Sequence, residues 1–147
     1  MIPQEGVKGF SRAQFDMGMV LGQGESGSVF LAFHRDTRTH FALKEIDIGA
    51  IGNRHQLCKE LQAHQECGNT RHIVDLYDFF AHEGRVYLVL EYMNWGSLDN
   101  LLKQQQQQYP LSPGMDERVL SIVVRSILHA LDFLHRTHNL IHRDLKP

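Results

Sequence analysis

The chain has 147 residues, of which 42% are hydrophobic, and its formal net charge at pH 7 is −2. This size suits one hydrophobic core, and the charge offers no basic excess for binding nucleic acid. No apolar run is long enough for a membrane span and the amino terminus lacks the features of a signal peptide, so cytoplasmic residence is the default expectation.

Cysteine and histidine form no metal-binding pattern. Cys58 and Cys67 are too few and too far apart for a zinc signature, and we expect both thiols to be free and buried or half-buried. His135 and His138 have no Cys or acidic partner at ligand spacing, which favours surface histidines. We therefore predict no metal ligands in this chain.

The first motif is rich in glycine. Residues 22–29, GQGESGSV, fit the pattern G-x-G-x-x-G-x-V. Glycines at this spacing let the backbone approach phosphate oxygens closely, with amide N–H groups as donors. Dinucleotide-binding folds, P-loops and ordinary hairpin turns contain similar strings, so the flanking residues must decide between them.

A dinucleotide-binding fold would need a helix directly after the glycines and an acidic residue about 20 positions further on. Glu45 and Asp47 satisfy the second requirement. The first is not met, because Val29, Leu31 and Phe33 alternate with the residues between them, which is the period of a strand.

A P-loop requires Lys and then Ser or Thr after its last glycine, where this chain has Ser28 and Val29. The remaining prediction is a strand, a glycine flap and a second strand. A simple hairpin turn is the alternative without function.

The second motif is the run F-A-L-K that ends at Lys44, after a turn signal at residues 36–39. In a strand, Ala42 and Lys44 point to the same face, so a small side chain and an ammonium group can share one cleft. A solvated lysine at a strand end is the alternative. The position of Lys44 one hairpin after the glycines favours a functional role.

Residues 53–67 are predicted to form a helix, in which Leu57 and Leu61 have i, i+4 spacing. Glu60 lies beside both leucines, and its carboxylate could pair with the strand lysine. Glu66 is the alternative partner, but it falls in the last helical turn, where the helix dipole disfavours a carboxylate. We therefore prefer Glu60.

Further along, residues 85–92 alternate as a strand, and the glutamine run at 104–108 indicates a solvated loop or a frayed helix end. A helix is predicted to start near residues 112–113 and to reach His135. Its apolar stripe is Val119, Leu120, Val123, Ile127, Leu131 and Leu134. Because the chain offers little to cover this stripe, we expect an exposed apolar patch over residues 116–135.

Residues 142–147, HRDLKP, match the start of the pattern H-R-D-L-x-x-x-N. In that pattern the Asp receives the proton of a substrate hydroxyl and the Asn holds a magnesium ion. Asp144 would be the proton acceptor. The Asn would be residue 149, beyond the 147 residues.

With these motifs in this order, the chain from about Phe15 to Pro147 resembles the first part of a eukaryotic protein-kinase domain. Within that family, the chain is most similar to the mitogen-activated protein kinase kinases. The similarity lies in short sequence segments at residues 59–62, 66–67, 72–74, 91–93 and 96–99. Asn94 and Trp95 depart from the acidic-glycine pair that is common at this turn.

The resemblance implies an α+β fold: a five-stranded antiparallel N-lobe sheet with one main helix, followed by the first helices of a helical C-lobe. It implies an N-terminal extension over residues 1–14, the N-lobe with its hinge over 15–93, and the start of the C-lobe over 94–147.

The resemblance also assigns site residues. It places Leu90 at the gatekeeper position, Glu91 and Met93 in the hinge that bonds adenine, and Ser97 near the ribose. The full set implied for nucleotide binding is Leu21, Gly22, Gly24, Gly27, Val29, Ala42, Lys44, Leu90, Glu91, Met93 and Ser97. The set implied for catalysis is Asp144, Lys146, Lys44 and Glu60.

The implied activity is transfer of the γ-phosphoryl group of ATP, with Mg²⁺, to Ser or Thr hydroxyls, and Tyr is left open. The implied partners are a protein substrate, with a MAP kinase as the candidate, and an upstream activating kinase. The magnesium-binding Asn and the Asp of the D-F-G segment fall beyond residue 147, so we expect the 147 residues alone to be inactive. The alternative is a non-catalytic kinase fragment that acts as a partner-binding module.

Overall fold

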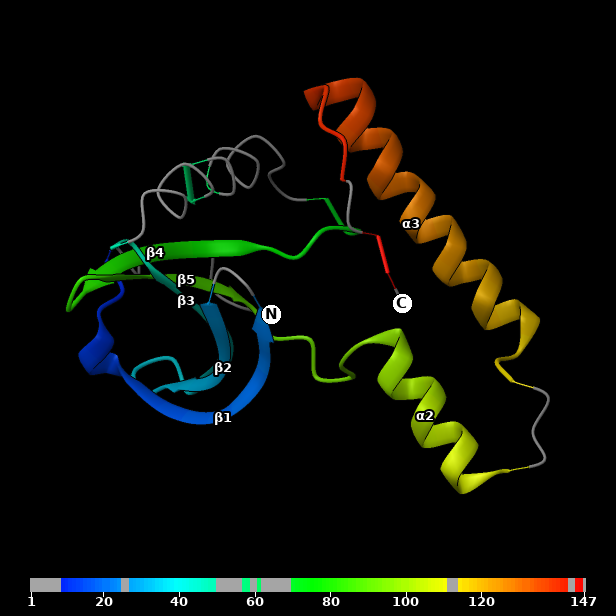
Figure 1. Ribbon diagram of the computed structural model, residues 1–147, viewed down its shortest axis with the longest axis horizontal. Coiled ribbons are helices and arrows are strands. Elements are labelled where there is room, and N and C mark those ends of the chain that lie inside the picture. Colours follow the sequence, from blue (N-terminus) through cyan, green and yellow to red (C-terminus); the bar gives the residue numbers. More distant parts are fainter. Residues whose placement is uncertain are drawn as a thin grey trace. The chain divides into compact units, whose positions relative to one another are not determined.

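The computed structural model describes residues 9–24, 27–49, 57–58, 61, 70–110, 114–142 and 145–146. The chain divides into two compact units. The first comprises Met1–Gln65 with Val74–Tyr92 and holds a β-sheet, and the second comprises Glu66–Ile73 with Met93–Pro147 and holds two helices (Figure 1). None of the helices in the described ranges is long and apolar enough to cross a membrane.

The first unit is built on a five-stranded antiparallel sheet in the order β1-β2-β3-β5-β4 (Figure 1). A short 3-10 helix, η1, precedes it at Arg12–Gln14. The strands are β1 Phe15–Gly24, β2 Gly27–His34, β3 Thr39–Asp47, β4 Leu76–His82 and β5 Arg85–Glu91. The strands predicted at 28–34 and 85–92 are confirmed as β2 and β5, and the predicted antiparallel sheet is correct. Burial does not alternate along β5, because residues 86–89 are all buried in the two apolar clusters.

The β4–β5 hairpin shows why the sequence turns where it does. Glu83 and Gly84 both have positive φ, 47° and 75°. Two central residues with positive φ give the turn twist that matches the right-handed twist of paired strands. Glycine adopts this conformation without a steric penalty, so Gly84 lets the chain reverse direction between His82, the last residue of β4, and Arg85, the first residue of β5.

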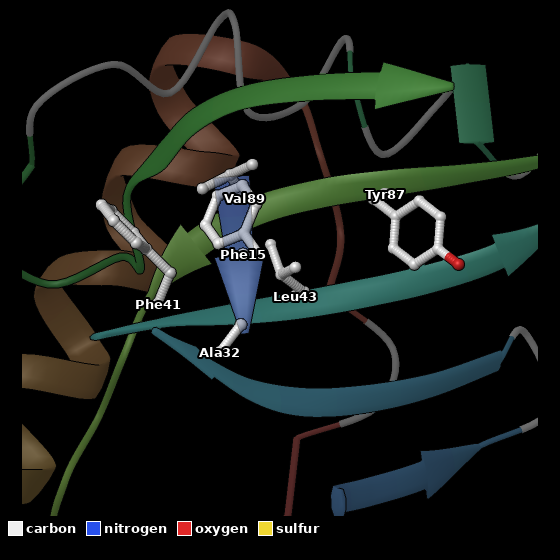
Figure 2. Packing of buried hydrophobic residues seen from close by; sticks show 6 residues of the cluster. All are labelled: Phe15, Ala32, Phe41, Leu43, Tyr87 and Val89. Carbon is white, nitrogen blue, oxygen red and sulfur yellow. The ribbon is translucent and has the colours of Figure 1, made fainter. Parts of the chain in front are cut away.

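Two apolar clusters lie on opposite faces of this sheet. Alternate residues of a strand point to opposite faces, so on β3 one face has Leu43 and the other has Lys44. We call these the Leu43 face and the Lys44 face. The Leu43 face carries the cluster of Phe15, Ala32, Phe41, Leu43, Tyr87 and Val89 (Figure 2). The Lys44 face carries Ile46, Leu57, Val86 and Leu88.

The helix predicted over residues 53–67 is described at three positions, and all three are helical: Leu57, Cys58 and Leu61. Leu57 is buried in the cluster on the Lys44 face and Leu61 packs against it, so the i, i+4 prediction for these leucines is confirmed. Cys58 is exposed, because the next residue along a helix turns about 100° away from the buried side. The expected burial of that thiol is therefore wrong, and Cys67 lies outside the described residues.

The second unit contains α2, Leu98–Gln108, and α3, Glu117–His138. The glutamine run forms the last turns of α2, so it is a helix end and not a loop, and residues 104–108 are helical throughout, without the predicted fraying. The start of α3 is later than predicted, because the side chain of Asp116 accepts from Arg118 N at 2.8 Å and caps the helix there. Asn139 ends α3 in the left-handed conformation, with φ of 53°.

The helix α3 is amphipathic, but its apolar side chains are not buried by other parts of the structure: none of its 22 residues is buried. Ile122 is 66% exposed and Leu128 is 60% exposed, and three further apolar residues are also exposed: Val119, Leu120 and Val124. Exposed apolar residues within 116–135 are therefore confirmed, but only Val119 and Leu120 of the predicted stripe are among them. The other four stripe residues, Val123, Ile127, Leu131 and Leu134, are half-buried.

His34 is the one buried polar residue among those described, with 0% of its surface exposed. Its ring lies 4.9 Å from the rings of both Phe10 and Phe15, measured between centroids. Thr37 provides the polar contacts, since its backbone N–H donates to Nδ1 at 3.2 Å and its hydroxyl lies 2.8 Å from the same atom. Burial lowers the pKa of His34, and the nearby Asp36 carboxylate opposes this more weakly.

This lowered pKa predicts acid lability. A histidine that resists protonation in the folded state contributes stability above its unfolded pKa of about 6.5, and that contribution is lost as the pH falls further. We expect the urea midpoint of the chain to drop between pH 7.5 and pH 5, and to drop less in His34→Gln. The exposed His40→Gln is the control, and an equal drop in all three proteins would contradict the prediction.

Candidate functional site

Strand register gathers four of the predicted site residues on the Lys44 face. Val29 on β2 pairs with Lys44 on β3, and Ala42 on β3 pairs with Leu90 on β5. Directly opposed residues in antiparallel strands project to the same side of the sheet. Val29, Ala42, Lys44 and Leu90 therefore form one patch across three strands.

The patch is apolar, with a cation at one end. Ala42 is buried, and Val29, Leu90 and Lys44 are half-buried. The next residue of β3 on this face, Ile46, already belongs to the buried cluster with Leu57. The open part of the patch thus ends at Lys44. A flat apolar group could lie against Ala42 and Val29 while an anion attached to it reaches the ammonium.

The glycine flap is the tip of the β1–β2 hairpin. Gly22 pairs with Val29, so the row that contains Lys44 continues onto β1. No described atom lies within 4 Å of the position that a Cβ would take at Gly22 or at Gly24. Among the described residues nothing requires glycine at these two positions, and none of their atoms fills the space beside this backbone.

Gly27 has a different role. Its φ is 141°, and a Cβ built there would lie 1.8 Å from the backbone oxygen of Glu45 on β3. Only glycine lets β2 pass β3 this closely. The sequence motif does not distinguish its three glycines, but in the structure Gly27 is needed for the packing of β2 against β3.

Leu21, another predicted nucleotide-binding residue, lies in an irregular part of β1. The pairing of β1 with β2 shifts register between Met17 and Val20 and again between Val20 and Gly22. Such irregularities bend a strand and change where its side chains point. Leu21 is 40% exposed.

Some backbone N–H and C=O groups of the predicted hinge residues already form hydrogen bonds within the protein. Glu91 N donates to Asp75 O at 2.9 Å, so this N–H is already used within the fold. In the second unit, Met93 O accepts from Gly96 N at 3.1 Å. The Ser97 hydroxyl accepts from Asn100 N at 3.2 Å and caps α2, a role that the sequence did not reveal.

Two of the predicted catalytic residues, Glu60 and Asp144, lie outside the described residues, so the pairing of Glu60 with Lys44 stays a prediction. Lys146 is described and exposed. Across the described ranges, no group of three or more His, Cys, Asp or Glu is arranged to hold a metal ion.

The Leu43 face carries a polar network that could not be predicted from the sequence. Glu45 Oε1 accepts from Arg85 Nη1 at 3.0 Å, and Glu45 Oε2 accepts from the Tyr87 hydroxyl at 2.7 Å. Burial raises the pKa of Tyr87 and its hydrogen bond to Glu45 adds to this, while the Glu45 carboxylate raises the pKa of Arg85. These residues come together only through the pairing of β3 with β5.

A methyl group added at Gly27 or at Gly24 should have different effects on stability. Gly27→Ala should lower the free energy of unfolding by roughly 1–3 kcal/mol or more, because the new Cβ meets a strand backbone and φ is unfavourable. Gly24→Ala should leave it unchanged or slightly higher. Urea unfolding of both variants checks this, and equal losses at the two positions would show that Gly27 has no special packing role.

Comparison with known proteins gives the family. Residues 15–147 match the protein kinase domain model. The chain is 34% identical to mitogen-activated protein kinase kinase 1c of Physcomitrium patens, covering 93% of this chain and 38% of that protein. It is 40% identical to mitogen-activated protein kinase kinase 5 of Leishmania mexicana, covering 88% and 23%.

Aurora kinase C of Mus musculus is also similar, with 33% identity over 95% of this chain and 49% of that protein. The chain therefore spans less than half the length of each of these relatives. The matched model covers nearly all of the chain and includes both the sheet and the two helices. The chain belongs to the protein kinase domain family, and its relatives include the mitogen-activated protein kinase kinases.

Proposed function

We propose that the chain forms the nucleotide-binding part of an ATP-dependent kinase of the mitogen-activated protein kinase kinase type. The observation that carries this proposal is the patch on the Lys44 face. It combines a half-buried ammonium with apolar side chains from three strands and lies in register with the glycine flap. A nucleotide needs this pairing of an apolar wall with a phosphate-binding cation.

The apolar residues would hold the base. Leu21, Val29 and Ala42 would pack on the adenine faces, with Leu90 behind it. The carbonyl of Glu91 could accept from the adenine amino group, since its N–H is already donated to Asp75. The N–H of Met93 would be the complementary donor, and Ser97 would lie on the ribose side.

The phosphates would lie along the glycine flap. The open space beside Gly22 and Gly24 would let backbone N–H groups approach the phosphate oxygens, and the Lys44 ammonium would bind them by charge. Glu60 would orient Lys44. Magnesium, when bound with ATP, would neutralise phosphate charge. Asp144 would accept the proton of the substrate hydroxyl, and Lys146 would stabilise charge on the transferring group.

The proposed acceptors are Ser and Thr hydroxyls, with Tyr left open, in a protein substrate for which a MAP kinase is the candidate. The proposed regulator is an upstream activating kinase, and the proposed location is the cytoplasm. We take residues 15–93 as the N-lobe with its hinge and 94–147 as the start of the C-lobe. For the 147 residues by themselves we expect weak nucleotide binding without phosphoryl transfer.

A pair of ligands tests the role of Lys44. Because its ammonium would contact phosphate, Lys44→Met should weaken Mg-ATP binding about tenfold, the loss of one charge-assisted hydrogen bond, and leave adenosine binding nearly unchanged. Isothermal titration of the 147-residue chain measures both affinities. Lys103→Met removes an exposed lysine on α2 and is the matched control.

Equal losses of ATP and adenosine binding would mean that Lys44 supports the fold and does not contact phosphate. Failure of the unmodified chain to bind either ligand would refute a nucleotide site within these residues.

The exposed apolar side chains of α3 favour a second candidate, the non-catalytic partner-binding module. Five large apolar residues are exposed on this helix, Val119, Leu120, Ile122, Val124 and Leu128, and extensive exposed apolar surface marks interaction sites. If α3 is such a surface, the double variant Ile122→Glu and Leu128→Glu should abolish self-association or capture of a partner. Sedimentation of the chain checks this against Gln106→Glu, an exposed control on α2. Unchanged sedimentation of a chain that self-associates would exclude α3 as the contact surface.

A further inference from the structure

A second surface lies on the opposite side of the sheet from Lys44. The Leu43 face is covered at one end by Phe10, which packs on the apolar cluster there and donates its N–H to Asp78 at 3.1 Å. Towards the other end a groove of about 580 Å³ remains. Its apolar floor is formed by Met17, Phe30 and Tyr87.

The floor of this groove is rigid. Tyr87 is 5% exposed, its ring stacks on Phe80 at 5.2 Å between centroids, and its hydroxyl donates to Glu45. Figure 2 shows this hydroxyl pointing away from the rest of the apolar cluster. A surface whose rotamers are already fixed loses little conformational entropy when a ligand binds to it.

Charged side chains surround the groove. Its lining holds three guanidinium groups, those of Arg12, Arg35 and Arg85, and two carboxylates, those of Glu45 and Glu83. Arg85 is paired with Glu45 at 3.0 Å, and Arg35 Nε lies 3.4 Å from Asp16. Glu83 lies 3.8 Å from His82. Arg85 and Arg35 are thus each paired with a carboxylate, whereas the neighbour of Glu83 is an imidazole, which carries a charge only when it is protonated.

Arg12 is the exception. Its Nη1 donates to the carbonyl of Phe15 at 2.9 Å, and within the described part of the chain no carboxylate lies at ion-pair distance from it. That carbonyl holds the guanidinium in place without neutralising it. Arg35 Nη2 donates to Ala13 O, so both guanidinium groups are attached to the same short segment, η1. The groove therefore has an oriented positive charge above an apolar floor.

We infer that this groove is a docking site for an extended peptide of a partner protein, in which an acidic side chain stands next to an apolar one. The apolar side chain would cover Met17 and Phe30, and the carboxylate would meet Arg12 and Arg35. A fork of guanidinium donors suits a carboxylate, and uncompensated charge at a surface site mainly provides specificity. An open, Arg-rimmed groove suits a peptide better than a small ligand that needs near-complete burial. This inference does not depend on the nucleotide site, which uses the other face.

The test uses the 147-residue chain and fluorescein-labelled peptide GSDLDFESG, with fluorescence anisotropy as the readout. We expect saturable binding that weakens as salt is added, since the contacts are charged and near the surface. The peptide GSKLKFKSG, with the same apolar residues and reversed charge, should not bind. Arg12→Glu should weaken binding of the acidic peptide about tenfold or more, whereas Arg125→Glu, the same charge change on exposed α3, should not.

Amide shifts of the labelled, unmodified chain give a second readout that needs no variant. On adding the acidic peptide, shifts centred on Ala13, Phe30 and Tyr87 support the site, even if Arg12→Glu fails to fold by circular dichroism. Several outcomes overturn it: no binding at about 1 mM chain, equal binding of both peptides, equal loss in the Arg125→Glu control, or shifts centred elsewhere. Shifts in the same amides that depend on chain concentration without peptide would assign the groove to a second copy of the chain, and the inference would be wrong.

Discussion

The pairing of β3 with β2 on one side and with β5 on the other is the constraint on which the rest of the sheet depends. It places Leu43 and Lys44 on opposite faces, because successive residues of a strand alternate. A shift of one residue in either pairing would bury the ammonium of Lys44 in the aromatic cluster and expose Leu43. The buried rings of Phe15 and Phe41 therefore hold the register that positions Lys44.

The two faces of the sheet present different surfaces for binding. The Lys44 face is completed by leucines of a helix, and its open part offers an apolar wall that ends at a cation. The Leu43 face is closed at one end by Phe10 and leaves a charged groove at the other. A ligand on one face leaves the other accessible within this unit, so nucleotide binding and partner binding need not compete for the same residues.

Much of this arrangement could be predicted, because it depends on local patterns. Alternation gave β2 and β5, the glycines gave the β1–β2 hairpin tip, and the spacing of Leu57 and Leu61 gave their packing direction. What escaped prediction depends on strand neighbours. The close approach of Gly27 to Glu45, and the network of Glu45 with Arg85 and Tyr87, exist only once register is known. The start of α3 was misplaced because Ser112 and Asp116 both look like helix caps.

Glu45 contacts both the glycine flap, through its backbone, and the groove on the Leu43 face, through its side chain. Its backbone oxygen lies where Gly27 has no side chain, directly under the base of the glycine flap, and its carboxylate is held by Arg85 and Tyr87 at the edge of the groove. A displacement of this one residue would be transmitted to both. Coupling between two binding events is thermodynamically reciprocal. Any ligand in the groove that moves Glu45 and so changes the affinity of the flap for its ligand must have its own affinity changed by the same factor.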